Sequence, residues 1–290
     1  MQIGVFATFM SPLATPHFIT DFARRAEAAG LESIWMGEHV VLFDKTEFPY
    51  PGSRDGKLPV PDGGGMLDTV ATFGFLAAAT QRVRLGTGIA LISQRNPIYT
   101  AKEFTSLDWL SNGRIDFGIG VGWCKEEVLA SGYTWEDRGA RSDEFLELVT
   151  RLWTQSPASY EGKHFRVADC RLDPKPIQQP HVPIIVGGHS DAALKRAAKY
   201  GAGWYGFAIR PEQTAEVLTR LDHALQARGR SRRDFEVIVT PPYRVDADEI
   251  RAFAELGVDR VVPLLGAQTP DAVKGRLDEL QRLVEVAKAL

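Results

Sequence analysis

Short apolar runs alternate along the chain with longer runs in which apolar residues recur every three or four positions. The short runs have the length of buried strands, and the longer runs have the periodicity of amphipathic helices. In residues 16–30, for example, Phe18, Phe22 and Ala26 fall on one helical face, and Gly30 ends the segment. The expected strands are residues 3–9, 33–38, 82–93, 114–122, 182–188, 203–209, 234–243 and 258–266. The expected helices are residues 16–30, 66–81, 97–113, 141–154, 190–201, 211–229, 247–257 and 270–290.

This alternation predicts about eight strand–helix units, the number at which a parallel sheet can close on itself. We therefore expect an α/β fold, a (β/α)8 TIM barrel, and we assign residues 1–290 to one domain. A doubly wound open sheet is the alternative, but it rarely contains so many units. Ser142 is expected to be the N-cap of the helix over residues 141–154.

Two long segments interrupt the alternation, residues 43–65 and residues 154–181. The first is rich in Pro and Gly and follows the second strand, on the face where barrel enzymes hold their active sites. We interpret it as a lid. The second enters a strand from the opposite side and is expected to contain a short hairpin around Gly162. A structural and a functional role are equally compatible with that segment.

The composition is that of an ordinary globular protein of 290 residues, 44% hydrophobic and 24% charged, with a net charge of −3. This balance gives no reason to expect a nucleic-acid or membrane partner. The basic run at residues 228–233 is expected to be a solvated turn on the bottom face of the barrel. The sequence has no signal-peptide pattern and no apolar run of about 18 residues, and Cys124 and Cys170 form no CxxC motif, so we expect a cytoplasmic location.

Several familiar catalytic motifs are missing from the sequence. It contains no GxxxxGK[ST] phosphate loop, no GxSxG nucleophile elbow, and neither HxH nor HExxH, so no built-in metal centre is expected. The glycines of "GIGVGW" do not match the dinucleotide fingerprint, which requires Gly or Ala at its last position. Small or polar residues at strand ends are the candidates that remain.

Glycines occur inside two expected strands, in "LGTGIALI" and in "GIGVGW". A glycine within a strand marks a bulge or the close approach of another group. Tight packing inside the barrel explains Gly86 equally well. In the second run the alternating Gly118, Gly120 and Gly122 leave one side of the strand bare, where a flat ring could lie.

Gly187 and Gly188 lie between an expected strand and a helix that begins near Ser190. Glycine lets the backbone approach a phosphate, and the N-terminus of a helix favours an anion. An ordinary turn capped by Ser190 or Asp191 explains the same residues, and Asp191 opposes an anion. Both interpretations stay open on the local sequence.

Glu38 and His39 end the second expected strand, next to the lid. A histidine at a strand end is commonly structural, but an imidazole exchanges protons near neutral pH and barrel enzymes carry out catalysis at this face. His39 is therefore a candidate for proton transfer to or from a bound ring.

Taken together, residues 3 to about 207 resemble the bacterial luciferase-like flavin and deazaflavin oxidoreductase superfamily. The similarity lies in "GEHV", "RVRLGTGI", "NPIYTAKEFTSLDWLSNGRIDFGIGVGW", "DEFLELVTRLWT", "YEGKHF", "PKPIQQPHVPIIVGG" and "GAGWYGF". The long run from "NP" to "GVGW" is the most specific of these. The matches resemble the branch that uses the deazaflavin coenzyme F420 more than the FMN branch.

The resemblance implies a barrel whose mouth holds a tricyclic ring, with coenzyme F420 as the cofactor and FMN as the alternative. It implies that His39 is catalytic and lies near the reactive centre of the ring, that the bond between Gly88 and Ile89 is a cis peptide behind the ring, and that residues 187–189 hold a phosphate. The implied cofactor-binding residues are Glu38, His39, Thr87, Gly88, Ile89, Gly120, Gly122, Trp123, Gly187, Gly188 and His189.

One residue departs from the family pattern. In the sugar-phosphate dehydrogenases that the chain resembles, the position matching Trp123 is a glutamate that donates a proton, which an indole cannot do. Glu126 and Glu127 are close in sequence but are expected to lie a turn away from the site. A sugar-phosphate substrate is therefore not expected, and acid–base chemistry falls to His39 or to the substrate itself.

Three functions are compatible with the sequence. The first is an F420-dependent oxidoreductase that transfers hydride between deazaflavin and an unidentified organic substrate. The second is an FMN-dependent luciferase-like monooxygenase, and the third is a non-catalytic flavin-binding protein. By analogy with the family, whose barrels pair through helices of the early units, we expect a homodimer.

Overall fold

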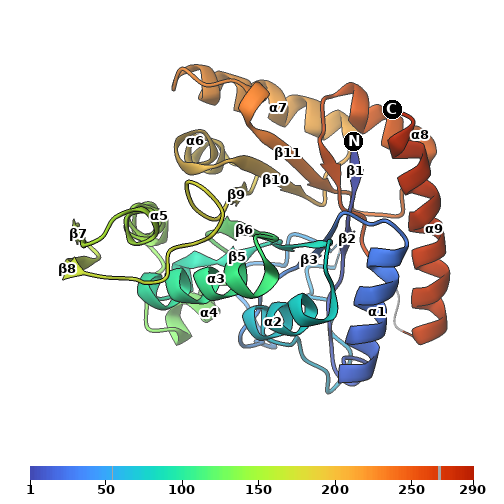
Figure 1. Cartoon of the computed structure of the whole chain (residues 1–290), viewed down its shortest axis with the longest axis horizontal. Coiled ribbons are helices and arrows are strands. Elements are labelled where there is room, and N and C mark those ends of the chain that lie inside the picture. Colours follow the sequence, from blue (N-terminus) through green and yellow to red (C-terminus); the bar gives the residue numbers. More distant parts are fainter. Residues whose placement is uncertain (54, 267–268) are drawn as a thin grey trace.

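The chain forms a parallel β-barrel with helices around it (Figure 1). The computed structural model describes residues 1–53, 55–266 and 269–290, so Arg54 of the expected lid lies outside the described residues. The barrel strands are β1 (Gln2–Ile3), β2 (Val5–Phe6), β3 (Ser33–Met36), β4 (Arg84–Thr87), β5 (Ala90–Leu91), β6 (Ile115–Gly120), β9 (Ile184–Gly187), β10 (Gly203–Phe207), β11 (Glu236–Thr240) and β12 (Arg260–Val261). The helices are α1 (Pro16–Ala28), α2 (Thr69–Ala79), α3 (Pro97–Ser111), α4 (Lys125–Ala130), α5 (Arg138–Thr154), α6 (Asp191–Tyr200), α7 (Pro211–Gln226), α8 (Ala247–Glu255) and α9 (Pro270–Lys288).

The sheet closes on itself through the first extended segment of the chain. Strand order around the barrel is β1-β12-β11-β10-β9-β6-β4-β3-β2, with parallel pairing along it. Because β1 and β2 are consecutive pieces separated only by Gly4, the pairing of β1 with β12 and of β2 with β3 joins the two ends of the sheet. The predicted (β/α)8 barrel is confirmed.

Residues at the helix ends explain where several helices begin and stop. The side chain of Asn96 accepts hydrogen bonds from the Ile98 and Tyr99 amides, and Pro97 follows it as the first residue of α3. The same helix ends where Asn112 takes a left-handed conformation with φ of 57°. Ser190 caps α6, as its sequence predicts.

Two details differ from the sequence-based expectation. Helix α5 begins at Arg138 with Asp137 as its N-cap, so Ser142 lies inside the helix and is buried rather than capping it. In the extra turn the Arg141 amide donates to the Asp137 carbonyl. Rules based on local sequence do not compare that hydrogen bond with the one that Ser142 would make as an N-cap. The six-residue α4 was not expected, since one and a half turns are too short to show a periodicity.

The two long connections behave differently from each other. The described residues of segment 43–65 contain neither a helix nor a strand. Segment 154–181 contains the predicted hairpin, in which β7 (Ala158–Glu161) pairs antiparallel with β8 (Arg166–Cys170). The basic run lies at the bottom face as expected, because it precedes β11, and Arg230 donates to the carbonyls of Ala198 and Gly201.

The barrel interior is filled in layers up to the carboxyl ends of the strands. At the bottom, the buried Arg260 guanidinium pairs with Asp116 at 2.8 Å and with Glu236 at 2.7 Å. Above this charged layer Trp35 stacks on Tyr205 with ring centroids 5.1 Å apart. Among the described residues, the cavity of the barrel lies above the aromatic layer, at its mouth. No described helix is both long and apolar enough to cross a bilayer.

Candidate active site

A cavity of about 760 Å³ opens at the carboxyl ends of the barrel strands. Its walls come from the ends of β2, β6, β9 and β10, from the segments after β3 and β4, from the lid, and from the N-terminal halves of α5 and α6. Of the predicted cofactor-binding residues, those that line it are Glu38, His39, Gly88, Ile89, Gly120, Gly122, Trp123, Gly187, Gly188 and His189. Thr87 stands apart, since it is buried below the cavity and its hydroxyl donates to the Gly118 carbonyl at 2.6 Å.

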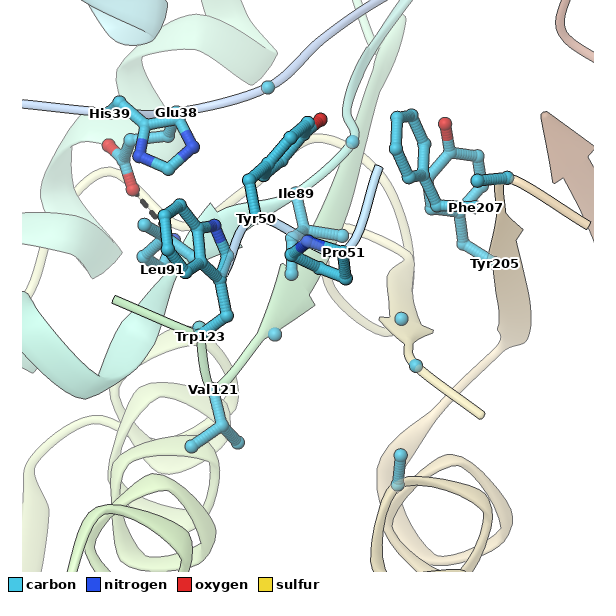
Figure 2. Close-up of a pocket in the computed structure, with 18 of the residues that line it drawn as sticks. Glu38, His39, Tyr50, Pro51, Ile89, Leu91, Val121, Trp123, Tyr205 and Phe207 are labelled. Carbon is cyan, nitrogen blue, oxygen red and sulfur yellow. Dashed lines mark hydrogen bonds between the residues drawn. The ribbon is translucent and has the colours of Figure 1, made fainter. Parts of the chain in front are cut away.

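The side chain of Ile89 occupies the space that two of the glycines leave. A Cβ atom added to Gly120 would lie 1.8 Å from Ile89 Cδ1, and one added to Gly187 would lie 2.8 Å from Ile89 Cγ2. The bare side of this strand therefore accommodates Ile89 rather than lying open to a ring, which corrects the expectation for Gly120. Ile89 lies in the middle of the cavity in Figure 2, and the Gly88–Ile89 bond is cis.

His39 forms a hydrogen bond with Glu127, a residue that we expected to lie away from the site. The distance from His39 Nδ1 to Glu127 Oε2 is 2.9 Å, and the Glu127 side chain is only 1% exposed. Glu127 does not itself line the cavity, but α4 brings its side chain into contact with His39. An ionised carboxylate only accepts, so with Glu127 charged the shared proton belongs to Nδ1, and Nε2 is the nitrogen left to meet a ligand.

Both oxygens of the Glu38 carboxylate form hydrogen bonds within the protein. One oxygen accepts the Leu91 amide at 2.6 Å, and the Arg95 guanidinium donates to the other at 2.6 Å. Burial by itself lowers the pKa of Arg95, but Glu38 and Glu103 outweigh burial and raise it above its ordinary value. Glu38 therefore lines the cavity while holding in place the segment that follows Ile89.

Three aromatic side chains lie together on the side of the cavity that carries His39 (Figure 2). The ring centroids of His39 and Trp123 are 5.9 Å apart, and Tyr50 of the lid lies 5.5 Å from Trp123. Burial raises the pKa of Tyr50, so its hydroxyl stays protonated at neutral pH. A flat molecule entering this side meets aromatic faces and three groups able to form hydrogen bonds, on His39, Tyr50 and Trp123.

In the turn after β9, one of the two glycine amides is already used in a hydrogen bond within the protein. Gly188 has a φ of 109°, and its amide donates to the Tyr205 carbonyl at 3.3 Å, so it is not free for a phosphate. Burial, together with Arg220, lowers the pKa of His189, which leaves its imidazole neutral near pH 7. The predicted anion site at Gly187–Gly188 thus relies on the residues around the turn.

Arg138 supplies a cation beside this turn that the sequence reading missed. Its guanidinium lies 3.6 Å from the ring centroid of Trp135, and its Nη1 donates to the Trp135 carbonyl at 3.0 Å. Its buried Nε has no hydrogen-bond partner among the described residues. Arg196, the other arginine that lines the cavity, is already paired with Asp143 at 2.7 Å. Arg138 is therefore the lining arginine best placed to meet an anionic group.

The lid is held over the mouth by contacts with α4 and with the segment before α5. Lys125 pairs with Glu47 at 2.6 Å, and the Glu47 amide donates to Glu126 at 2.8 Å. Phe48 stacks on Trp135 with ring centroids 5.6 Å apart. The Arg138 guanidinium also lies over the Trp135 ring. Trp135 therefore contacts both the lid and the arginine that lines the cavity.

The geometry agrees with what comparisons with known proteins find. A family model described as luciferase-like monooxygenase matches residues 1–285. An uncharacterized protein of Mycobacterium tuberculosis is 32% identical over 241 residues, covering 83% of this chain and 84% of that protein. An F420-dependent glucose-6-phosphate dehydrogenase of Amycolatopsis mediterranei is 28% identical over 193 residues, covering 65% of this chain and 53% of that enzyme.

Solved structures share the fold at lower identity. An F420-dependent secondary alcohol dehydrogenase in complex with an F420-acetone adduct has a TM-score of 0.79 at 20% identity, covering 99% of this chain and 98% of that one. The oxygenating constituent of 3,6-diketocamphane monooxygenase from Pseudomonas putida, in complex with FMN, has a TM-score of 0.78 at 14% identity, covering 100% and 99%. These two similarities show the fold, and the family model shows the family. The chain belongs to the luciferase-like monooxygenase family.

Proposed function

We propose that this protein is a coenzyme F420-dependent oxidoreductase that acts on an organic substrate. The proposal rests on the arrangement of one cavity. The His39–Glu127 pair lies on one side of it, and the glycine turn after β9 lies on another side together with Arg138. Relatives named as F420-dependent glucose-6-phosphate dehydrogenases support F420 over FMN. The bound coenzyme supplies or accepts the hydride, as cofactors do in such enzymes.

The side chains of the protein have separate tasks in this proposal. His39 holds or delivers a proton at Nε2, and Glu127 keeps the Nδ1 proton in place. Ile89 and Trp123 provide apolar surface for the ring, and Arg138 meets an anion of the coenzyme tail. The lid excludes water, which strengthens the electrostatic interactions inside the cavity.

A binding titration tests the coenzyme and the role of Arg138 together. We expect purified protein to bind F420 more tightly than FMN, and FMN more tightly than riboflavin, which lacks the phosphate. Replacing Arg138 with Leu should weaken F420 and FMN binding about tenfold or more, because a hydrogen bond to a charged group is lost, and leave riboflavin binding unchanged. The coenzyme absorption and fluorescence report the binding.

Arg228→Leu is the matched control, since Arg228 is exposed at the bottom of the barrel. An equal loss of riboflavin affinity in Arg138→Leu would contradict the anion role. Failure of both F420 and FMN to bind would overturn the proposed function.

An FMN-dependent monooxygenase is the second candidate, favoured by the FMN complex that shares this fold. Tighter binding of FMN than of F420, followed by oxygen consumption when the FMN-loaded protein is reduced, would select it. Binding of a flavin with no reaction of the reduced form toward oxygen or any ketone would instead select a non-catalytic flavin-binding protein.

We also propose that the chain forms a homodimer through α2 and α3, which pack on each other. Exposed apolar side chains gather there, with Phe75 44% exposed, Ile98 45% and Leu110 70%. A second copy presents the same apolar side chains, so the surface is complementary to itself. Sedimentation equilibrium should give a dimer, and Leu110→Glu should shift it to monomer. The control Leu290→Glu, at the exposed C-terminus, should remain a dimer, and a monomeric parent protein would refute the proposal.

A further inference from the structure

The cavity has two sides of different chemistry. The side formed by β9, α5 and α6 carries Arg138, Arg196, His189 and Ser190, together with Glu136 just before α5. Strand β2 lies opposite, because the path from β2 to β9 crosses β3, β4 and β6 in one direction and β12, β11 and β10 in the other. The lining residues on the β2 side are Phe6, Thr8, Met10 and Met66, which is bridged to Met10, and Leu58 and Pro59 of the lid line the same cavity.

The apolar wall on the β2 side is built by two segments joined through their backbones. Met10 and Met66 form an antiparallel bridge. The Ser11 amide donates to the Gly65 carbonyl at 2.9 Å, and the Leu67 amide donates to the Phe9 carbonyl at 3.1 Å. These bonds fix the end of the lid against the chain after β2, so the Met10 and Met66 side chains stand together in the cavity wall.

Charge is distributed unevenly between the two sides. Of the arginines that line the cavity, Arg138 is the first residue of α5 and Arg196 lies in the second turn of α6. Among the described lining residues, the β2 side contributes no Lys or Arg. A phosphate or carboxylate bound there would lose its hydration without gaining a counter-ion, which is unfavourable. Thr8 contributes a hydroxyl group to that wall, and His39 and Tyr50 lie at the edge of the wall.

We propose that the β2 side is the substrate subsite and that it takes an uncharged molecule with an apolar body and a single hydroxyl or carbonyl group. This inference rests on the proposed function, in which the coenzyme occupies the side with Arg138. The apolar body packs against Met10, Leu58 and Met66, and the oxygen faces His39. The subsite therefore differs from what a phosphorylated sugar requires, even though relatives at 28% identity are named as glucose-6-phosphate dehydrogenases.

Equilibrium dialysis of the F420-loaded protein against two probes tests this inference. We expect 2-octanone to bind and glucose 6-phosphate to remain unbound at the same concentration. Leu58→Ser should weaken 2-octanone binding about fivefold, because the variant removes apolar surface from the wall. The control Leu67→Ser changes a neighbouring leucine that is 37% exposed and does not line the cavity, and it should bind 2-octanone like the parent protein.

The outcomes separate this inference from the proposed function. Two results would overturn the inference: preferential binding of glucose 6-phosphate, or no binding of 2-octanone up to its solubility limit. If F420 still binds in either case, the proposed function stands. Equal weakening by Leu58→Ser and Leu67→Ser would also overturn it, since the wall would then have no specific role. If F420 fails to bind but 2-octanone binds the free protein in a Leu58-dependent manner, the subsite stands and the proposed function fails.

Discussion

Replacement of His39 with Ala is expected to lower coenzyme-dependent turnover by about a hundredfold or more, the range in which a positioned proton-transfer group contributes. The reason is that His39 presents Nε2 at the cavity while Glu127 holds Nδ1 at 2.9 Å. Turnover is measured as oxidation of reduced F420 by 2-octanone under anaerobic conditions. Coenzyme affinity, measured separately by titration, should change only a few-fold.

The partner of His39 gives a second, independent variant of the same pair. Glu127→Gln should lower turnover by about tenfold or more, because an amide can also donate to Nδ1 and hold the wrong tautomer. Glu126→Gln is the neighbouring control, since Glu126 binds the lid backbone rather than His39. Normal turnover in His39→Ala would remove His39 from the chemistry. Loss in Glu126→Gln equal to that in Glu127→Gln would indicate a disturbance of the whole segment.

The largest effect on stability is expected at Gly118, in the middle of β6. A Cβ atom added there would lie 1.7 Å from the Thr87 carbonyl oxygen and 3.2 Å from the Trp35 ring. The contact is with backbone that cannot rotate away, and Thr87 is also tied to Gly118 by its hydroxyl. Gly118→Ala should therefore lower the free energy of unfolding by about 3 kcal/mol or more, measured by urea denaturation.

Gly275→Ala is the matched control for that substitution. Gly275 lies within α9, and a Cβ atom added there has nothing within 4 Å. Since Ala is the better helix former, this variant should gain about 0.5–1 kcal/mol. A gain in both variants, or equal losses in both, would show that the close approach of β4 to β6 does not limit the residue at position 118.

Much of the fold could be predicted from the sequence because its signals are local. The periodicity of residues 16–30 and the caps at Asn96 and Ser190 depend on neighbours within a few positions, and the structure places the elements accordingly. Boundaries were less predictable. Helix α5 begins before Ser142, and the strand expected over residues 82–93 is divided into β4 and β5.

The candidate site was predictable only in outline. Residues at the strand ends could be expected to gather at the mouth, because parallel strands of a barrel all end on the same face. Their individual contacts could not be expected. Glu38 accepts hydrogen bonds from Arg95 and Leu91. Thr87 lies below the cavity, and Ile89 fills the space beside Gly120. Arg138 has no sequence signal, since nothing in "EDRGAR" indicates that Arg141 pairs with Asp137 while Arg138 lies over the Trp135 ring.

The amino-acid sequence by itself determined the class of fold, the order of its strands and helices, and the face of the barrel at which ligands are expected. Those properties depend on periodicity and on residues close along the chain. The tertiary structure decided which side chains act together. The pairing of His39 with Glu127 joins residues 88 positions apart, and the separation of the cavity into a cationic and an apolar side depends on strands β9 and β2 facing each other. Contacts of this kind arise from closure of the sheet, which no local segment encodes.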